Sequence, residues 1–267
     1  MDRDTGCNER HGSESPNVPS AIEILSNATH ALQGLLLHVA DLLMPQDCFV
    51  CGGHAGGDAV CAACSAELPL HPAAACPVCA EPTGDARTCG RCLRHPPAFD
   101  ATWAVFDYAF PVDAMLHALK YRHRLALADF FAAAMLRAGA RPRLDLRVQA
   151  DVILPMPLHP RRLAERGFNQ AVEMARPIAR AAGLPLELAA VRRVRNTVAQ
   201  AGLDREARRR NPRGAFVSNT SLSGLRVVVV DDVMTTGATL DELAGVLKQQ
   251  GAAWVGNLVV ARTPAPD

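Results

Sequence analysis

The sequence has almost no net charge, no long apolar run and no segment typical of an export signal. Its 28 lysines and arginines nearly match its 27 aspartates and glutamates, and the formal charge of +1 excludes a global attraction to nucleic acid or membrane, although local patches stay open. The least polar stretch near the N-terminus, residues 24–40, contains Asn27 and Gln33 and is too short to span a bilayer. No basic region precedes an apolar core there, so we expect no signal peptide, no membrane span and a cytoplasmic protein.

The sequence also lacks two common catalytic patterns. It contains no G-x-x-x-x-G-K-[ST] motif, which excludes a P-loop nucleotide site. It shows no Cys–His arrangement for a nucleophilic mechanism. The chemistry of this chain therefore has to come from other residues.

Cysteine is abundant, with nine in a chain for which we expect no export, and this favours metal ligation over disulfides. The spacing C-x2-C-x9-C-x2-C occurs twice, with the second copy 28 residues after the first. The eight cysteines of the two copies are Cys48, Cys51, Cys61, Cys64, Cys76, Cys79, Cys89 and Cys92. Four thiolates form the tetrahedral site that zinc prefers, and a closed site of this kind is structural. The spacing leaves open whether each copy holds its own ion or the pairs combine crosswise, so we expect one or two structural zinc ions.

The chain divides into four parts by composition. Residues 1–19 are polar and rich in turn formers, which predicts a disordered tail. Residues 20–45 carry an apolar stripe at helical spacing that ends at Pro45, which predicts an N-terminal helix. Residues 46–97 hold the cysteine module, and residues 98–267 alternate strand-like and helix-like segments.

The alternation in the last part predicts a parallel sheet with helices on both faces. We expect strands at 102–108, 151–157, 227–230 and 252–262. We expect helices at 115–136, 168–183 and 238–251, the first with a break near Arg122 and the second in spite of Pro177.

The stretch VVVVDDVMTTGATL, residues 227–240, predicts a ligand site. The valines suit a strand buried on both faces, and ligands bind outside the carboxyl ends of strands in open α/β sheets. The loop that follows offers backbone N–H groups and hydroxyls for a phosphate, from Thr235, Thr236, Gly237, Ala238 and Thr239. Asp231 and Asp232 would repel a phosphate, so we expect them to bind paired sugar hydroxyls or Mg²⁺. A ribose that carries a 5′-phosphate would fit both the acids and the loop. The alternative is an ordinary turn between strand and helix, in which these residues are helix caps.

This stretch resembles the phosphoribosyl-diphosphate (PRPP) signature of type I phosphoribosyltransferases. The resemblance implies that Asp231 and Asp232 hold the ribose 2′- and 3′-hydroxyls and that residues 235–239 cradle the 5′-phosphate. It implies Mg²⁺ bound together with PRPP. The implied fold is a type I phosphoribosyltransferase fold, a central parallel sheet flanked by helices, with a small N-terminal double zinc-ribbon module.

The order of motifs over residues 42–262 resembles the ComF/GntX family of competence-associated proteins. The cysteine pairs are followed by LKYRHR (119–124), PMPLHPRRLAERGFNQA (155–171), TVAQAGLDREARRRNPRGAF (197–216) and the loop described above. One departure is His123, where the family pattern favours glycine. The resemblance implies a role in DNA uptake and in handling the incoming single strand, with DNA-uptake or recombination proteins as partners.

Transfer of the phosphoribosyl group would need cations for the leaving pyrophosphate, because the reaction passes through an oxocarbenium-like centre. By the same analogy the segment LPMPLHP (154–160) forms the pyrophosphate loop. Arg161, Arg162 and Arg166 follow it, and Lys120 is a further candidate for binding PRPP. We take Asp231, Asp232 and Arg166 as the candidate catalytic residues. Nothing in the sequence identifies an acceptor.

A run of arginines between 192 and 213 predicts a possible nucleic-acid contact. The candidate residues are Arg192, Arg193, Arg195, Arg208, Arg209 and Arg210. Two other interpretations are a solvated helix face and a role in binding PRPP itself. Three functions stay open: a phosphoribosyltransferase, a PRPP-sensing or DNA-binding protein that transfers nothing, and a zinc-knuckle adaptor of the uptake machinery.

Overall fold

The structure, a computed structural model, describes residues 47–139, 146–196 and 212–263. These residues belong to one compact unit, Asp47–Asp267. The expected tail at 1–19 and the expected helix at 20–45 lie outside the described residues. Among the helices that the structure describes, none is both long and apolar enough to cross a lipid bilayer.

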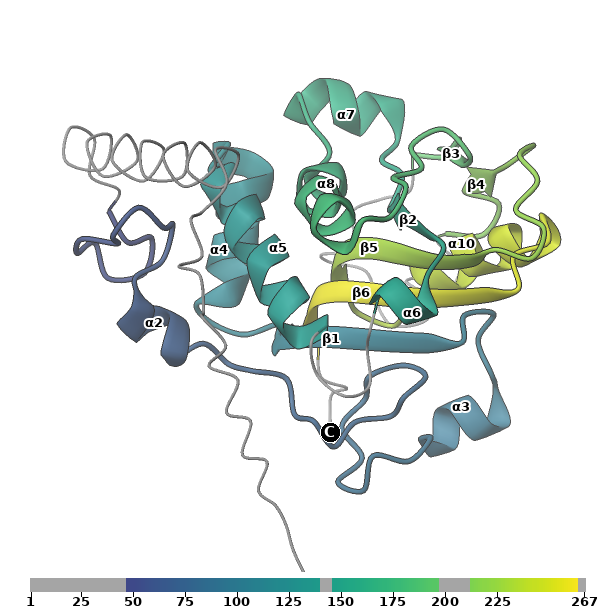
Figure 1. The fold of residues 1–267 in the computed structure, drawn as a ribbon, viewed down its shortest axis with the longest axis horizontal. Coiled ribbons are helices and arrows are strands. Elements are labelled where there is room, and N and C mark those ends of the chain that lie inside the picture. The colour runs from purple at the N-terminus through teal and green to yellow at the C-terminus, as the bar shows by residue number, and fades with distance from the viewer. Residues whose placement is uncertain (1–46, 140–145, 197–211, 264–267) are drawn as a thin grey trace, which may run out of the picture. The chain divides into compact units, whose positions relative to one another are not determined.

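Four parallel strands form the central sheet, in the order β1-β6-β5-β2 (Figure 1). They are β1 (Ala101–Asp107), β2 (Val152–Pro155), β5 (Arg226–Met234) and β6 (Trp254–Arg262). All four predicted strands are therefore present. A separate antiparallel pair joins β3 (Arg192–Arg193) to β4 (Phe216–Val217).

Helices cover both faces of this sheet, as the alternation of the sequence predicts. The longer ones are α4 (Val112–Arg122), α5 (Ala126–Gly139), α8 (Gln170–Ala182) and α10 (Ala238–Gln249). The predicted break near Arg122 is confirmed at His123, whose left-handed backbone (φ 54°) ends α4. A glycine adopts that conformation at little cost, which gives a physical reason for the glycine of the family pattern. The shorter helices are α2 (Ala62–Ala66), α3 (Gly90–Arg94), α6 (Leu146–Gln149) and α7 (Pro160–Arg166).

The valines of β5 divide between two apolar clusters because successive side chains of a strand point to opposite faces. Val228 and Val230 join the cluster that contains residues of α4, α5 and α8. Val227 and Val229 join the cluster that contains residues of α10. All four are fully buried, so β5 is the centre of the core.

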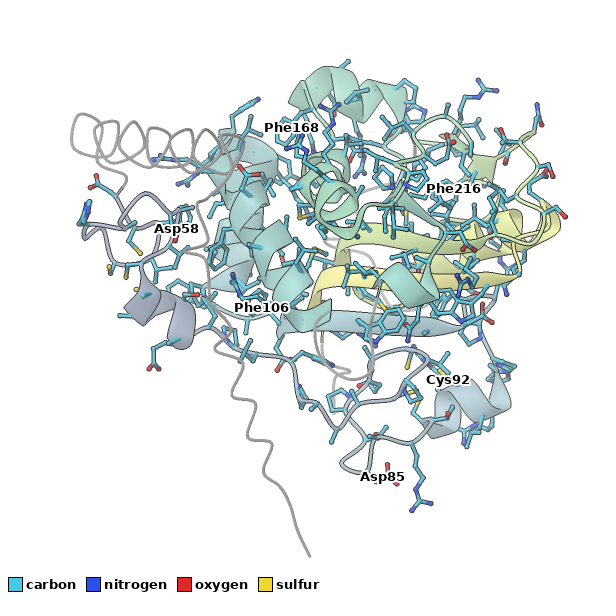
Figure 2. The ribbon with its side chains drawn as sticks, in the orientation of Figure 1. Asp58, Asp85, Cys92, Phe106, Phe168 and Phe216 are labelled. Carbon is cyan, nitrogen blue, oxygen red and sulfur yellow. The ribbon has the colours of Figure 1, made fainter. Side chains whose placement is uncertain are left out.

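The two cysteine repeats pack into different clusters. Cys48 and Leu68, from the first repeat and the residues after it, belong to the cluster with α4 and α5. Cys79 and Cys92 of the second repeat belong to the cluster with α10, and Figure 2 labels Cys92 on α3. Between the repeats the chain runs along β1, where the His71 N–H donates to the Val105 carbonyl at 2.9 Å. The cysteine module therefore covers what would otherwise be an open edge of the sheet.

Candidate functional site

A cavity of about 600 Å³ lies at the carboxyl ends of β2 and β5, where the sequence places the ligand site. It brings together most of the predicted site residues. These are Lys120, Arg162, Arg166, Asp231, Asp232, Thr235, Gly237, Ala238 and Thr239. The structure does not bring Arg161 or Thr236 into this cavity. Arg161 lies on α7 with its side chain 73% exposed and pairs with Glu165 at 3.2 Å, and Thr236 lines a neighbouring cavity instead.

The two acids lie inside β5, which runs four residues past the predicted strand. Both are buried, with relative exposures of 7% for Asp231 and 6% for Asp232. Each carboxylate accepts a backbone N–H at 2.9 Å: Asp231 from Asp232, and Asp232 from Val233. Lys120, from the last turn of α4, forms an ion pair with Asp232.

This arrangement gives the two neighbouring carboxyls opposite electrostatic environments. Burial raises the pKa of Asp231 well above its ordinary value, and the adjacent Asp232 charge adds to that effect. Burial also acts to raise the pKa of Asp232, but the Lys120 ammonium outweighs it and lowers the pKa. Burial acts to lower the pKa of Lys120 while Asp232 raises it, and the net direction is upward. Lys120 is thus the ion-pair partner of Asp232, while for Asp231 burial outweighs the nearby charge of Lys120.

The loop after the acids is closely packed against Met234. Gly237 precedes α10 with φ 83°, and a Cβ at this position would lie 2.6 Å from the Met234 Cε atom. Only glycine fits there without a shift. The loop leads directly into the first turn of α10, whose N–H groups have no partner within the helix, and such a turn binds anions.

Arginines line the same cavity. Arg166 ends α7 and donates to Gln170 at 3.0 Å and to the Tyr121 hydroxyl at 3.1 Å, with its guanidinium 4.9 Å from the Tyr121 ring centre. The sequence did not indicate Tyr121 or Gln170. It did not predict α7 either, because seven residues are too few to show a helical period.

The described arginines of the run at 192–213 lie in different environments. Arg193 lines the cavity, and its guanidinium lies 5.4 Å from the centre of the Phe216 ring; Figure 2 labels Phe216. Burial lowers the pKa of Arg193, although the charge of Asp231 acts in the opposite direction. Arg192 is exposed, and Arg195 donates to the carbonyl of Arg213. Arg208, Arg209 and Arg210 lie outside the described residues.

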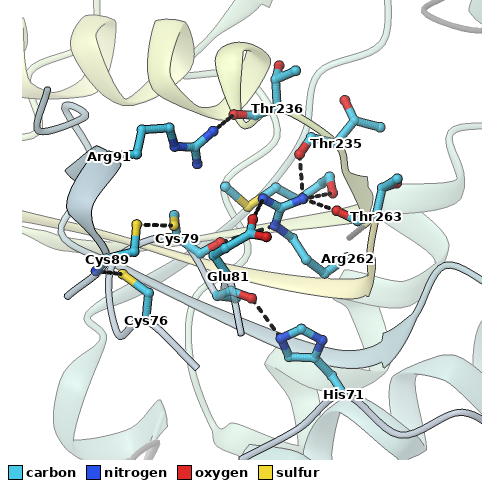
Figure 3. A network of polar contacts seen from close by, with 12 residues as sticks. His71, Cys76, Cys79, Glu81, Cys89, Arg91, Thr235, Thr236, Arg262 and Thr263 are labelled. Atoms are coloured by element: carbon cyan, nitrogen blue, oxygen red, sulfur yellow. Dashed lines mark hydrogen bonds and ion pairs between the residues drawn. The ribbon is translucent and has the colours of Figure 1, made fainter. Parts of the chain in front are cut away.

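Each cysteine repeat forms its own tetrad, which answers the question of pairing. In both tetrads the four sulfur atoms lie within 4.8 Å of one another. Backbone N–H groups point at the sulfurs: Cys61 donates to Cys48 and Cys89 donates to Cys76, both at 3.3 Å. Figure 3 shows the second tetrad, in which the Cys79 and Cys89 sulfurs are 3.6 Å apart. Four thiols without a carboxylate or an imidazole fit zinc, which would stabilise each repeat.

Comparison with protein families matches both parts of the chain. Residues 39–93 match the model of a double zinc ribbon domain. Residues 169–266 match the model of a phosphoribosyl transferase domain. Both tetrads lie within the first match, and the second match includes the acid pair and the loop at 235–239, whereas Lys120, Arg162 and Arg166 precede it.

Several relatives share most of their length with this chain. The DNA utilization protein YhgH of Salmonella typhi is 34% identical over 229 residues, which cover 83% of this chain and 99% of the relative. Competence protein F of Haemophilus influenzae is 31% identical, over 76% of this chain and 91% of the relative. Competence protein ComFC of Bacillus subtilis is 26% identical, over 76% of this chain and 84% of the relative.

Solved structures are more distant. Glutamine PRPP amidotransferase from B. subtilis is 23% identical over 49% of this chain and 26% of that one, with a TM-score of 0.33. Orotate phosphoribosyltransferase from Aeropyrum pernix is 22% identical over 53% of this chain and 62% of that one, also with a TM-score of 0.33. The chain is 34% and 31% identical to two of these relatives over most of their length, and it matches both domain models. It therefore belongs to the ComF family of competence and DNA utilization proteins, which join a double zinc ribbon to a phosphoribosyltransferase domain.

Proposed function

We propose that the cavity at the end of β5 binds PRPP together with Mg²⁺. The observation that carries the proposal is that one cavity is lined by a phosphate-type loop, a buried acid pair and a set of guanidinium groups. Asp231 and Asp232 would accept hydrogen bonds from the ribose 2′- and 3′-hydroxyls. The loop from Thr235 to Thr239 would bind the 5′-phosphate through its N–H groups.

The cations suit the other end of the ligand. Arg162, Arg166 and Arg193 line the cavity and would bind the pyrophosphate oxygens, for which guanidinium geometry is well matched. Mg²⁺, where bound, neutralises pyrophosphate charge and would itself be held by the ligand and by the acid pair. Because loss of pyrophosphate builds positive charge at the anomeric carbon, fixed carboxylates beside the ribose would stabilise that charge. The chain thus has the groups for phosphoribosyl transfer, with the acceptor unassigned.

Calorimetric titration of PRPP with Mg²⁺ tests the proposal. Wild-type protein should bind, and Asp231→Asn should lose most of the affinity while keeping the fold. Asp151→Asn is a matched control, because Asp151 pairs with Arg226 at the start of β5 and does not line the cavity. Absence of binding to the wild type would overturn the proposal. Binding without any release of pyrophosphate, over a panel of bases and amines, would favour a PRPP sensor over an enzyme.

We further propose that the protein supports competence by handling incoming single-stranded DNA in the cytoplasm, with uptake or recombination proteins as partners. The names of its relatives support this role, as DNA utilization and competence proteins. Among the described residues of the arginine run, Arg192, Arg195 and Arg213 are exposed and could contact phosphates. Affinity for an unlabelled single strand should fall steeply with salt. Binding that is absent or independent of salt would refute the DNA role.

A further inference from the structure

One arginine, Arg262, joins the second cysteine repeat to the loop of the proposed PRPP site (Figure 3). It ends β6 and is 1% exposed. On the ribbon side its guanidinium donates to the Cys79 carbonyl at 3.2 Å and to the Glu81 carboxylate at 2.6 Å. On the loop side it donates to the carbonyls of Met234 at 3.3 Å and Thr235 at 2.5 Å.

A second arginine makes a parallel connection. Arg91 lies on α3, between the ligand positions Cys89 and Cys92, and donates to the Thr236 carbonyl at 3.2 Å. Figure 3 shows Arg91 reaching Thr236 from the ribbon, and the Arg262 guanidinium, which comes from β6, between Glu81 and Thr235. Two guanidinium groups thus hold three consecutive carbonyls of one loop.

Those contacts fix the direction of the loop's N–H groups. In a planar trans peptide the carbonyl and the N–H of the next residue point in opposite directions. Holding the carbonyls of Met234, Thr235 and Thr236 toward the ribbon therefore turns the N–H groups of the following residues away from it. The loop's other side borders the cavity, which Thr235 and Gly237 line.

We infer that Arg262 and Arg91 are positioning residues, which couple the metal site of the second cysteine repeat to binding of the 5′-phosphate. The inference rests on the proposed binding of PRPP. Neither arginine would contact PRPP. Both act by holding the loop in the conformation that presents its N–H groups to the 5′-phosphate. Arg91 belongs to the second repeat itself, and Arg262, from the end of β6, reaches that repeat at the Cys79 carbonyl. A metal ion in the second tetrad would therefore hold the ribbon side of each contact in place.

Coupling of this kind is reciprocal. If metal in the second tetrad increases the affinity for PRPP, then PRPP must increase the retention of that metal by the same factor. The first tetrad packs in the other apolar cluster, with residues of α4 and α5. PRPP should therefore protect one zinc ion of the loaded protein and leave the other unchanged.

The test uses the zinc-loaded full chain, with Arg91→Met and Arg87→Met as a matched pair. Both arginines lie in the second repeat, but the Arg87 side chain is 84% exposed and pairs with Asp85. Calorimetry with PRPP and Mg²⁺ should show about tenfold weaker binding for Arg91→Met, since a charged hydrogen bond is lost, and wild-type binding for Arg87→Met. Zinc release to a chelating dye, with and without PRPP, gives the second readout. PRPP should slow the release of one ion in the wild type and in Arg87→Met, and much less in Arg91→Met.

Each outcome decides the question. Equal PRPP affinity in Arg91→Met and the wild type would overturn the positioning role. Zinc release that PRPP does not slow, in wild type that binds PRPP, would overturn the coupling to the metal. A wild type that binds no PRPP would overturn the proposed function and this inference with it, and that result is distinct from a difference between variants.

Discussion

Replacing either of the two adjacent acids by the isosteric amide should change stability in opposite directions. Asp231→Asn should stabilise the ligand-free protein at pH 7, because it removes a carboxyl whose pKa burial raises well above its ordinary value. Asp232→Asn should destabilise it, because it leaves the Lys120 ammonium without its partner. Both changes should weaken binding of PRPP, so only Asp231→Asn should raise stability while it lowers affinity.

The size of each effect follows from the surroundings. The penalty at Asp231 cannot exceed the cost of protonating a carboxyl of ordinary pKa 3.8 at pH 7, which is about 4 kcal/mol. We expect a gain of about 1–4 kcal/mol from Asp231→Asn. Breaking a fully buried ion pair costs about 3–5 kcal/mol. Lys120 is 19% exposed and Asp231 can replace the lost charge, so about 2–3 kcal/mol is expected for Asp232→Asn.

The pH dependence separates the two carboxyls further. The pKa of Asp231 is raised in the folded state, so the folded state binds its proton more tightly and wild-type stability falls as pH rises toward and through that pKa. The advantage of Asp231→Asn should therefore shrink as pH is lowered from 7 toward 4. The pKa of Asp232 is lowered, so its stabilising effect is complete above its ordinary pKa and is lost only as pH falls through the lowered value. The deficit of Asp232→Asn should stay constant between pH 7 and pH 5.

Thermal unfolding followed by circular dichroism, with zinc in the buffer and no PRPP, measures both effects. Each kcal/mol should move the midpoint by about 2–4 °C for a domain of this size. Midpoints that fall equally for both variants would refute the reasoning, because they would mean that the two acids share Lys120. A stabilised Asp231→Asn that still binds PRPP normally would leave the charge argument intact but remove Asp231 from the ligand site.

Two further changes test the metal sites and the loop. Cys76→Ser should halve the zinc content, measured by atomic absorption, and lower the unfolding midpoint, because a structural zinc ion contributes on the order of 10 kcal/mol to folding; unchanged zinc would contradict the tetrad assignment. Gly237→Ala should abolish PRPP binding and cost about 1–3 kcal/mol in chemical denaturation, since the new Cβ would meet the Met234 Cε at 2.6 Å with φ at 83°. Gly245→Ala is its control, because a Cβ there meets no atom within 4 Å.

Local patterns predicted the sheet and the loop because their causes are local. A run of valines followed by acids and a Thr-Gly loop needs no distant partner to specify a strand, a turn and a helix start. A local pattern does not show how the arginines of the run at 192–213 are placed. Arg192 and Arg193 are neighbours in sequence, yet one is exposed and the other lines the cavity, because successive side chains of a strand point to opposite sides. Only the pairing of β3 with β4 shows which of the two arginines faces the cavity.

Contacts between segments that are distant in the chain could not be predicted from the sequence. Arg262 meets Glu81 across 181 positions of the chain, and nothing near Arg262 indicates that partner. The sequence does show that Arg262 ends the otherwise apolar strand VVAR. A charge at the end of a buried strand requires a partner, but the pattern does not say which one. The division of the cysteine repeats between two clusters had no such signal, because their spacings are identical.

That division gives the duplication a physical reason. The first repeat shares an apolar cluster with α4, the helix that carries Lys120 to the acid pair. The second repeat shares a cluster with α10 and contacts the loop that precedes it. Only the second repeat has arginine contacts to the loop, whereas the first packs against the core on the other face of the sheet. The duplication therefore covers both faces of one sheet, and binding of PRPP should depend on the metal of the second repeat alone.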